Sequence, residues 1–549
     1  MSRLIIAQGI VALFVLYRLF FRKKPNTLPL PPGPKPLPVI GNIKDLPPPG
    51  VPEFEHWLPF KEKYGGISSV SIMGQTMIIL QDKEAIGELL EKTSLKTSAR
   101  PKFFFATEMC GFGTFLPAMQ YDDPFRKQRR FIHQQLGTKV LASRFNDIQD
   151  VESKRFLLRV LNDPQDYFEH IKACHPLTIS SEASAIILKI TYGYNIEPRG
   201  QDPLVKLIED VMSNLGQAFI PLAWLVDIIP AIRHLPDWFP GTGFKQTARK
   251  WKSANEAVTS SPYNFVQKQM EMGIHQHQSY VSELIKTYGN GDGTGVSEED
   301  AEVIRMTATA MYGGGADTTV STIMAFTIAM MLFPNVQRKA QEEIDRVVGS
   351  DRLPDYKDRE NLPYVDALVK EAIRYFPVVP IATAHRTEEE IFIRGYRIPQ
   401  SSFILASIWC LLHDPEVYQD PLVFDPERFL EPRNEPDPAD DVFGYGRRVC
   451  PGRYLATESL FLTLARLLAA FTISKGVDEN GKEIDVELKH APGLVDHPAE
   501  FAYNIRPRNE NYAYLVRRAG ADHPWEKSDS VSLEGDVMEQ YKLECKKEV

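Results

Sequence analysis

A lone cysteine lies in the stretch of this chain that is richest in chemical information, the run FGYGRRVCPG at 443–452. The residues after it, 453–470, have the composition of a helix, so the free N–H groups at its start would stabilise a thiolate at Cys450. Glycines on both sides of the cysteine lack a Cβ and would let the backbone approach a flat partner. Arg448 can hold a carboxylate through charge-assisted hydrogen bonds. A sulfur ligand, a flat partner and a carboxylate predict haem bound through a cysteine thiolate.

The spacing within this run resembles the haem-binding signature of the cytochrome P450 family of haem-thiolate monooxygenases. Its fixed positions are all filled, by Phe443, Gly446, Arg448, Cys450 and Gly452. The resemblance implies that these residues bind haem b and that Cys450 is the axial ligand of its iron. The alternative is a buried structural cysteine, which is the usual role of a lone cysteine. Family-specific spacing favours the ligand.

A second candidate lies in the middle of a long apolar segment, 301–333, which Pro334 should end as a helix. The run GGGADTT at 313–319 puts three glycines inside this helix, at a cost of about 1 kcal/mol each relative to alanine. Such a cost predicts a functional reason, for example local widening beside a groove. Asp317 and Thr318 add a carboxylate and a hydroxyl to this apolar surrounding.

This run resembles the oxygen-activating segment of the same family, in which an acid and an alcohol relay the protons that O–O cleavage requires. The resemblance implies catalytic roles for Asp317 and Thr318, in a pocket that otherwise excludes water. For Thr318 the alternative is back-bonding to the carbonyl of Gly314, and for Asp317 it is a structural ion pair.

A third group of residues indicates structure rather than chemistry. Glu371 and Arg374 have i, i+3 spacing on a helix that Pro363 opens, which puts both charges on one face. Alone they would form a surface ion pair of little value. With Arg428 downstream they resemble the family's Glu-x-x-Arg plus Arg triad, which implies a role in folding and haem retention. His385 matches a position that often contacts a haem propionate, and a core histidine is its alternative.

One departure from the family pattern lies in the segment 121–130. It aligns with the helix whose Trp-x-x-x-Arg usually holds a haem propionate, but Phe125 replaces the tryptophan. Phenylalanine has no N–H to donate. Arg129 remains as a donor, so we expect haem binding with one hydrogen bond fewer.

The resemblance also implies dioxygen as co-substrate and electrons from NADPH through NADPH–cytochrome P450 reductase, with cytochrome b5 as a second candidate donor. We expect a basic docking patch for the acidic reductase, formed by Arg126, Lys127, Arg130 and Arg447. Ordinary solvated charges are the alternative. The net charge of −9 argues against nucleic acid as a partner.

The N-terminus has the properties of a membrane anchor, residues 1–24. Its apolar part, 4–21, would span about 27 Å as a helix, close to the thickness of a bilayer core. Basic residues at 22–24 place the rest of the chain in the cytosol, and no cleavage site for a signal peptide follows. We therefore expect a single-pass protein of the endoplasmic reticulum membrane. The proline-rich residues 25–50 form a stiff hinge.

The fold that the resemblance implies for residues 51–510 is one mainly α domain with small β-sheets, an α+β arrangement. Residues 511–549 are predicted to form a polar, flexible tail, because they are charge-rich without a clear apolar period. The five cysteines are odd in number and widely scattered, which is typical of a reduced compartment and not of a disulfide framework.

Four mainly apolar stretches match substrate-contacting positions of the family: 103–115, 219–238, 378–381 and 493–495. They predict a hydrophobic small-molecule substrate, although core packing is the alternative for any single residue. The overall sequence resembles the filamentous-fungal branch of this family, whose members tailor polyketides, terpenoids and alkaloids.

Other function classes remain open beside the monooxygenase. They are a haem-thiolate isomerase or dehydratase that needs no reductase, a xenobiotic-oxidising monooxygenase, and a non-catalytic haem sensor. The presence of both Asp317 and Thr318 favours a monooxygenase over the isomerase and the sensor.

Overall fold

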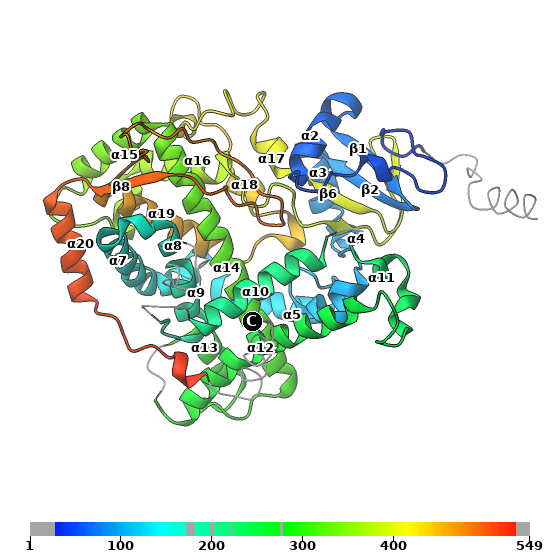
Figure 1. The fold of residues 1–549 in the computed structure, drawn as a ribbon, viewed down its shortest axis with the longest axis horizontal. Helices are drawn as coiled ribbons and strands as arrows, with labels where there is room; N and C mark the ends of the chain where they lie inside the picture. The colour runs from blue at the N-terminus through cyan, green and yellow to red at the C-terminus, as the bar shows by residue number, and fades with distance from the viewer. Residues whose placement is uncertain (1–27, 172–181, 198–201, 221–222, 275–277, 534–549) are drawn as a thin grey trace, which may run out of the picture.

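Helices predominate in the computed structural model, which describes residues 28–171, 182–197, 202–220, 223–274 and 278–533 (Figure 1). The helices of the first half are α2 (Glu53–Tyr64), α3 (Lys83–Ile86), α4 (Ser94–Thr97), α5 (Asp123–Leu136), α6 (Lys139–Ala142), α7 (Asn146–Asn162), α8 (Tyr167–Ile171), α9 (Glu182–Tyr192), α10 (Pro203–Ala218) and α11 (Leu225–Ile228). Those of the second half are α12 (Gly243–Glu271), α13 (Tyr280–Tyr288), α14 (Glu298–Leu332), α15 (Pro334–Val347), α16 (Pro363–Tyr375), α17 (Ile408–Leu412), α18 (Ala439–Val442), α19 (Arg453–Ala470) and α20 (Glu510–Asp522). The predicted anchor at 1–24 lies outside the described residues.

The strands form three small sheets. Their bounds are β1 (Ile67–Ile72), β2 (Gln75–Leu80), β3 (His385–Arg386), β4 (Ile391–Ile393), β5 (Tyr396–Ile398), β6 (Phe403–Ala406), β7 (Phe471–Lys475) and β8 (Tyr503–Pro507). One sheet has the order β1-β2-β6-β3, with β2 parallel to β6, and the other two are the antiparallel pairs β4-β5 and β7-β8. The prediction of a mainly α fold with small sheets is confirmed.

The proline-rich segment packs against the large sheet from residue 28 onward. The Ser69 N–H on β1 donates to the carbonyl of Pro32 over 2.8 Å. A Cβ at Gly33 would lie only 1.8 Å from the Ser69 carbonyl oxygen, so only glycine allows this approach. Whether the segment also orients the domain on a membrane stays a prediction.

Helix α14 runs through the interior of the protein and contributes side chains to both of its large hydrophobic cores (Figure 1). Its first half packs with α5, α9, α10, α12 and α13, and its second half packs with α8, α15, α16 and α19. The side chain of Ser297 caps its start, and Pro334 opens the next helix directly after it. Of the helices in the described ranges, α14 alone is long and apolar enough to cross a bilayer, but 67% of its most apolar window is buried in the protein. It is a core helix.

The predicted flexible tail at 511–549 is wrong for residues 511–533. Helix α20 packs on α7, with Tyr512 and Val516 buried, although its sequence has no long apolar run that would predict a packed helix. The chain then continues along the protein, where the guanidinium of Arg155 lies 5.0 Å from the ring of Trp525. Asp529 accepts a hydrogen bond of 2.9 Å from the Asn195 N–H. Residues 534–549 lie outside the described part of the chain.

Candidate active site

A cavity of about 390 Å³ lies between the middle of α14 and the cysteine loop at 443–452. Such a volume is in the range of small-molecule and cofactor sites. Its walls are mostly apolar and include the side chains of Phe125, Ile187, Thr318, Val378, Val379 and Leu455. Phe443, Arg448, Cys450 and Gly452 of the predicted signature also line the cavity.

The cysteine loop is held by its own backbone. The N–H of Cys450 donates to the carbonyl of Phe443 over 2.7 Å, which closes the loop just before α19 begins. Gly446 has a φ of +55°, and a Cβ there would lie 2.3 Å from the carbonyl oxygen of Leu90. Gly446 is therefore required by a close approach to another part of the chain. It is not among the residues that line the cavity, and its predicted place beside a flat cofactor stays a prediction.

Two opposing effects act on the sulfur of Cys450. Burial is the larger and raises the pKa of the thiol. The N–H of Gly452, the positive charges of Arg129 and Arg453, and the N–H of Arg453 lower the pKa. The donors come from the start of α19, where a helix stabilises negative charge. A metal cation bound to this sulfur would remove the remaining barrier to deprotonation.

Four basic side chains gather at one end of the cavity: Arg100, Arg129, His385 and Arg448. Backbone carbonyls hold each of them: Arg448 Nη2 donates to Met119 over 2.7 Å, Arg129 Nη1 donates to Val449 over 2.8 Å, and His385 Nδ1 lies 2.8 Å from the Thr97 oxygen. Arg100 Nη1 donates to Ala384 over 2.8 Å. Within the described ranges, no carboxylate forms an ion pair with any of the four.

Burial lowers the pKa of all four groups. Burial and the charge of Arg100 lower the pKa of His385 well below its ordinary value. Burial, and then Arg129, lower the pKa of Arg448 to about 10. Buried cations are costly unless they are paired. The cluster therefore calls for an anionic ligand.

These residues fit haem b. A thiol on the cavity wall can ligate its iron, and the basic cluster can hold its two carboxylates through Arg100, Arg129, Arg448 and His385. Bound haem would supply the activation of dioxygen, while the protein would supply binding, orientation and electrostatics. Arg100 is a site residue that the sequence prediction missed. Its run SARP at 98–101 carries no distinguishing pattern, so only the tertiary structure reveals it.

Comparison with known families identifies the fold and the site together. A sequence profile described as Cytochrome P450 matches residues 31–503, which is most of the chain. The chain belongs to the cytochrome P450 family.

Similar proteins come from fungi. Cytochrome P450 monooxygenase CLM2 of Gibberella zeae is 46% identical over 97% of this chain and 99% of its own. Multifunctional cytochrome P450 monooxygenase af510 of Aspergillus fumigatus is 48% identical over 91% of this chain and 92% of its own. O-methylsterigmatocystin oxidoreductase of Aspergillus flavus is 37% identical over 97% and 98%. This chain is accordingly a cytochrome P450 monooxygenase.

In this cytochrome P450, phenylalanine replaces the expected tryptophan without leaving a gap. Phe125 is only 2% exposed, and the guanidinium carbon of Arg448 lies 3.9 Å from the centre of its ring. A cation held over an aromatic face is attracted by the ring quadrupole. The ring of Phe125 therefore packs against the guanidinium of Arg448, and it has no N–H group that could donate a hydrogen bond to a ligand.

The glycines of α14 make room for packing and for the cavity. A Cβ at Gly315 would lie 2.9 Å from Ile187 of α9, whereas a Cβ at Gly314 would meet nothing within 4 Å. The hydroxyl of Thr318 lines the cavity and donates to the Gly314 carbonyl over 2.8 Å, which is the back-bonding alternative. Asp317 does not line the cavity, and its Oδ1 lies 3.1 Å from Nε2 of His497.

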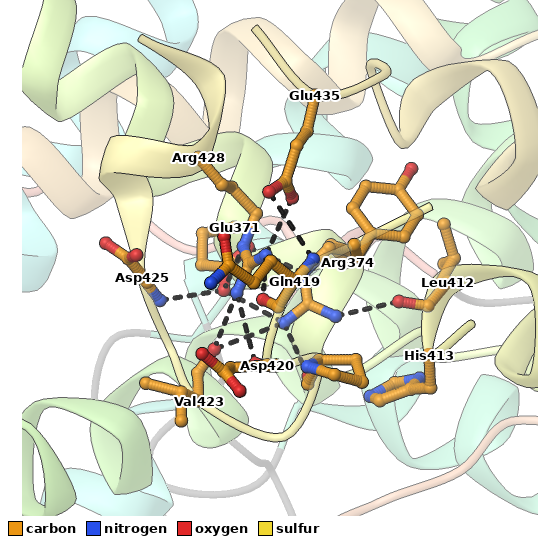
Figure 2. A network of polar contacts seen from close by, with 12 residues as sticks. Glu371, Arg374, Leu412, His413, Gln419, Asp420, Val423, Asp425, Arg428 and Glu435 are labelled. Carbon is orange, nitrogen blue, oxygen red and sulfur yellow. Dashed lines mark hydrogen bonds and ion pairs between the residues drawn. The ribbon is translucent and has the colours of Figure 1, made fainter. Parts of the chain in front are cut away.

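The predicted triad lies together, as Figure 2 shows, and none of its three residues lines the cavity. Glu371 receives Arg374 Nε over 2.7 Å and Arg428 Nε over 3.1 Å, and all three side chains are fully buried. Arg428 also donates to Glu435 over 2.7 Å. Glu435 also accepts a hydrogen bond of 2.5 Å from Arg433, so each arginine of the network has a carboxylate partner. Such a network stabilises the fold and touches no ligand.

The predicted docking patch is largely neutralised by neighbouring acids. Arg126 pairs with Asp123, and Lys127 lies 2.8 Å from Asp300. Arg447 donates to the hydroxyl of Tyr121 over 2.8 Å. Arg130 is exposed.

Proposed function

We propose that this cytochrome P450 inserts one atom of dioxygen into a hydrophobic small molecule, as a tailoring step in fungal terpenoid, polyketide or alkaloid biosynthesis. The observation that carries the proposal is the cavity, which combines a thiol ligand and an unneutralised basic cluster with otherwise apolar walls. The similarity to named monooxygenases of fungi supports the class of reaction.

A second cavity of about 160 Å³ supports the proposed substrate class. It shares Arg100 and Thr383 with the first cavity, so the two adjoin. Its walls come from all the stretches predicted to contact substrate, including Phe103, Phe219 and Leu494. An apolar route of this kind favours a molecule without charged groups, because burying a charge without a partner is costly.

The chain's own residues divide the work as follows. Cys450 binds the cofactor iron, and the basic cluster orients the cofactor by its carboxylates. Thr318 holds a hydroxyl at the cavity surface, where it can exchange its bond to Gly314 for one to a reacting group. Asp317, directly before it in α14, supplies the proton. The apolar walls exclude water that would otherwise divert the reaction.

The partners form a further part of the proposal. An NADPH-dependent reductase, or cytochrome b5 as a second donor, would dock where Arg130 and Arg447 lie. Exposed apolar side chains support a membrane location. Val39 is 76% exposed and Trp238 is 82% exposed, and both lie in loops without a covering element. Together with residues 4–21 they favour a single-pass protein of the endoplasmic reticulum with a cytosolic catalytic domain.

The test is expression in yeast together with a reductase, with feeding of sesquiterpenes, polyketides and alkaloids and identification of products by mass spectrometry. We expect an oxygenated product and a thiolate-type spectrum of the reduced carbon monoxide complex. Cys450→Ala should lose both. A thiolate-type spectrum in that variant would contradict the assignment of Cys450 as the ligand. Turnover without reductase or NADPH would contradict the monooxygenase function and favour an isomerase.

Proton delivery has its own test within this system. Thr318→Ala should keep haem and substrate binding but release hydrogen peroxide at the expense of product, because general acid catalysis typically contributes about 10²–10⁴-fold. Asp317→Asn should behave in the same way. Unchanged product per NADPH in both variants would make the two residues structural.

A further inference from the structure

The acid of α14 has a partner that belongs to no sequence motif. Asp317 Oδ1 lies 3.1 Å from Nε2 of His497, in the loop after residue 489. The His497 side chain keeps 25% of its surface accessible and that of Asp317 keeps 33%. Over the described ranges, His497 is the one basic side chain within ion-pair distance of Asp317. The pair thus joins the cavity helix to groups that water can reach.

The loop that carries His497 is fixed by its neighbour Asp496. The Asp496 N–H donates to Val378 over 2.8 Å, its carbonyl accepts the hydroxyl of Ser321 on α14, and its side chain is 1% exposed. Its carboxylate accepts the N–H of Ala491 over 3.0 Å and also contacts His490. Three anchors hold the residue before His497, so the imidazole is presented to α14 by a rigid loop.

The remaining nitrogen of His497 is also informative. Nδ1 is buried and has no hydrogen-bond partner among the described residues. A buried polar atom without a partner costs free energy, and native proteins keep such atoms mainly where a water molecule or a function needs them. The imidazole is therefore not locked by a second contact from the protein.

The residue type matters for what the pair can do. Arginine or lysine at this place would hold Asp317 permanently as a carboxylate, because both stay protonated at neutral pH. Histidine is the side chain whose ordinary titration lies nearest neutrality, so a histidine–aspartate pair can share one proton. An acid that must give up a proton in every cycle and regain it needs a partner of this kind.

We propose that His497 resupplies Asp317 with protons from solvent. The imidazolium gives the proton on Nε2 to Oδ1 of Asp317. Nε2 of the neutral imidazole then takes up one proton from hydronium or a buffer acid in solvent, so the relay is balanced over one cycle. His497 acts through Asp317 and is a positioning residue rather than a catalytic one. The inference rests on the relay role proposed above for Asp317 and Thr318. Of the other titratable groups of this loop, Asp496 and His490 are paired with each other, and Glu500 is exposed.

The first experiment needs no turnover. The holoenzyme is labelled with ¹⁵N-histidine, and the His497 resonances are assigned by their loss in His497→Gln. We expect the Nε2 resonance of His497 to shift in Asp317→Asn, while the resonances of His490 stay in place. An unchanged His497 resonance would show that the two side chains do not interact in solution, which overturns the inference.

The second experiment separates proton transfer from structure. Glutamine at 497 can keep a hydrogen bond to Asp317 but cannot pass on a proton. With 7-ethoxycoumarin as probe substrate and NADPH and reductase as electron source, we expect His497→Gln to form about tenfold less product per NADPH, less than the roughly hundredfold loss expected for a general acid itself. Imidazole added to His497→Ala should restore the yield. With hydrogen peroxide as oxidant, which brings its own protons, His497→Gln should match the parent.

The control is His490→Gln, which breaks the other histidine–aspartate pair of the loop and should leave the product yield unchanged. A parent-like yield in His497→Gln, or equal losses with NADPH and with peroxide, would overturn the inference and make the pair structural. If Thr318→Ala and Asp317→Asn also keep the parent's yield, the relay itself is wrong. If only those two variants lose it, the relay stands and His497 is not its source of protons.

Discussion

Two groups of charged side chains in this protein differ in whether carboxylates of the protein compensate their positive charge. Around Glu371, each arginine has a carboxylate partner within the fold, and Arg433 shares Glu435 with Arg428. Around Arg448, four basic groups face a cavity and no carboxylate of the described chain pairs with them. Arg374 and Arg428 are fully buried, whereas Arg448 is half-buried on the cavity wall, and both groups donate to backbone carbonyls.

The difference separates a structural network from a binding site. Buried charge is stable only when it is compensated. In the Glu371 network the fold itself supplies the compensation, so the network can form as the chain folds. In the Arg448 cluster a ligand with negative charge must supply it. The balance of charge around a buried arginine thus distinguishes the two roles, although the residue type is the same.

Breaking the balanced network should have the largest effect. Glu371→Ala would leave Arg374 and Arg428 buried without their shared carboxylate. Removing one partner of a buried pair typically costs about 3–5 kcal/mol, which is a large share of the stability of a domain. We expect little or no folded holoprotein, measured by the haem content of the purified protein. Normal yield and haem content would show that the network is dispensable.

Neutralising a member of the open cluster should act in opposite directions with and without ligand. Arg448→Met should weaken haem retention by about 1.5–3 kcal/mol, the value of a hydrogen bond to a charged group. In the haem-free protein the same change should leave stability equal or higher, because a buried charge without a carboxylate is removed.

Heat-induced haem loss and chemical unfolding of the haem-free form measure the two effects of Arg448→Met. Arg374→Met is the matched control and should destabilise both forms. If Arg448→Met destabilised the haem-free form as much as Arg374→Met, the two groups of charge would not differ in kind.

The pH dependence of stability should sharpen the comparison. Burial lowers the pKa of His385 well below its ordinary value, and it lowers that of His413, beside Arg374, to about 3. Both stay neutral in the folded haem-free protein but take up a proton on unfolding below about pH 6.5. The unfolded state then binds more protons than the folded state. As the pH decreases below that value, the free energy of unfolding should therefore decrease, by up to about 1.4 kcal/mol per pH unit for each histidine.

Variants assign the two contributions. His385→Gln should reduce the acid slope of the unfolding free energy, and haem binding should reduce it too, because a carboxylate beside His385 favours its charged form. The part of the slope due to His413 should persist in both cases. A slope that haem leaves unchanged would mean that no carboxylate of the cofactor approaches His385.

The smallest expected effect concerns the ring under Arg448. Phe125→Leu keeps an apolar side chain but removes the aromatic face, which we expect to cost about 1 kcal/mol of holoprotein stability. Thermal unfolding monitored by haem absorbance measures it. Phe125→Trp is the companion variant: it should match or exceed the parent if the indole fits, and a loss equal to that of Phe125→Leu would show that the buried site has no room for it.

Local patterns predicted much of this molecule. The helix expected at 453–470 has those bounds, and the long apolar helix ends where Pro334 follows it. Glu371 and Arg374 meet because helical i, i+3 spacing brings them together. In each case the interaction lies within one element or at its end, so a few neighbouring residues suffice to specify it.

Features that join distant segments were beyond the sequence patterns. Arg100 lies in an ordinary loop and becomes a site residue only because folding brings it beside Arg448. Helix α20 was missed because its short apolar face has meaning only against α7.

The sequence by itself identified the family and the long helix that carries the acid and the alcohol, and it predicted which cysteine would be the ligand. These depend on spacing along the chain, and spacing is preserved in any fold. The tertiary structure alone decided which charges are compensated, what Gly446 makes room for, and that His497 meets Asp317. These depend on packing between residues far apart in the chain, and packing is settled only when the whole core forms.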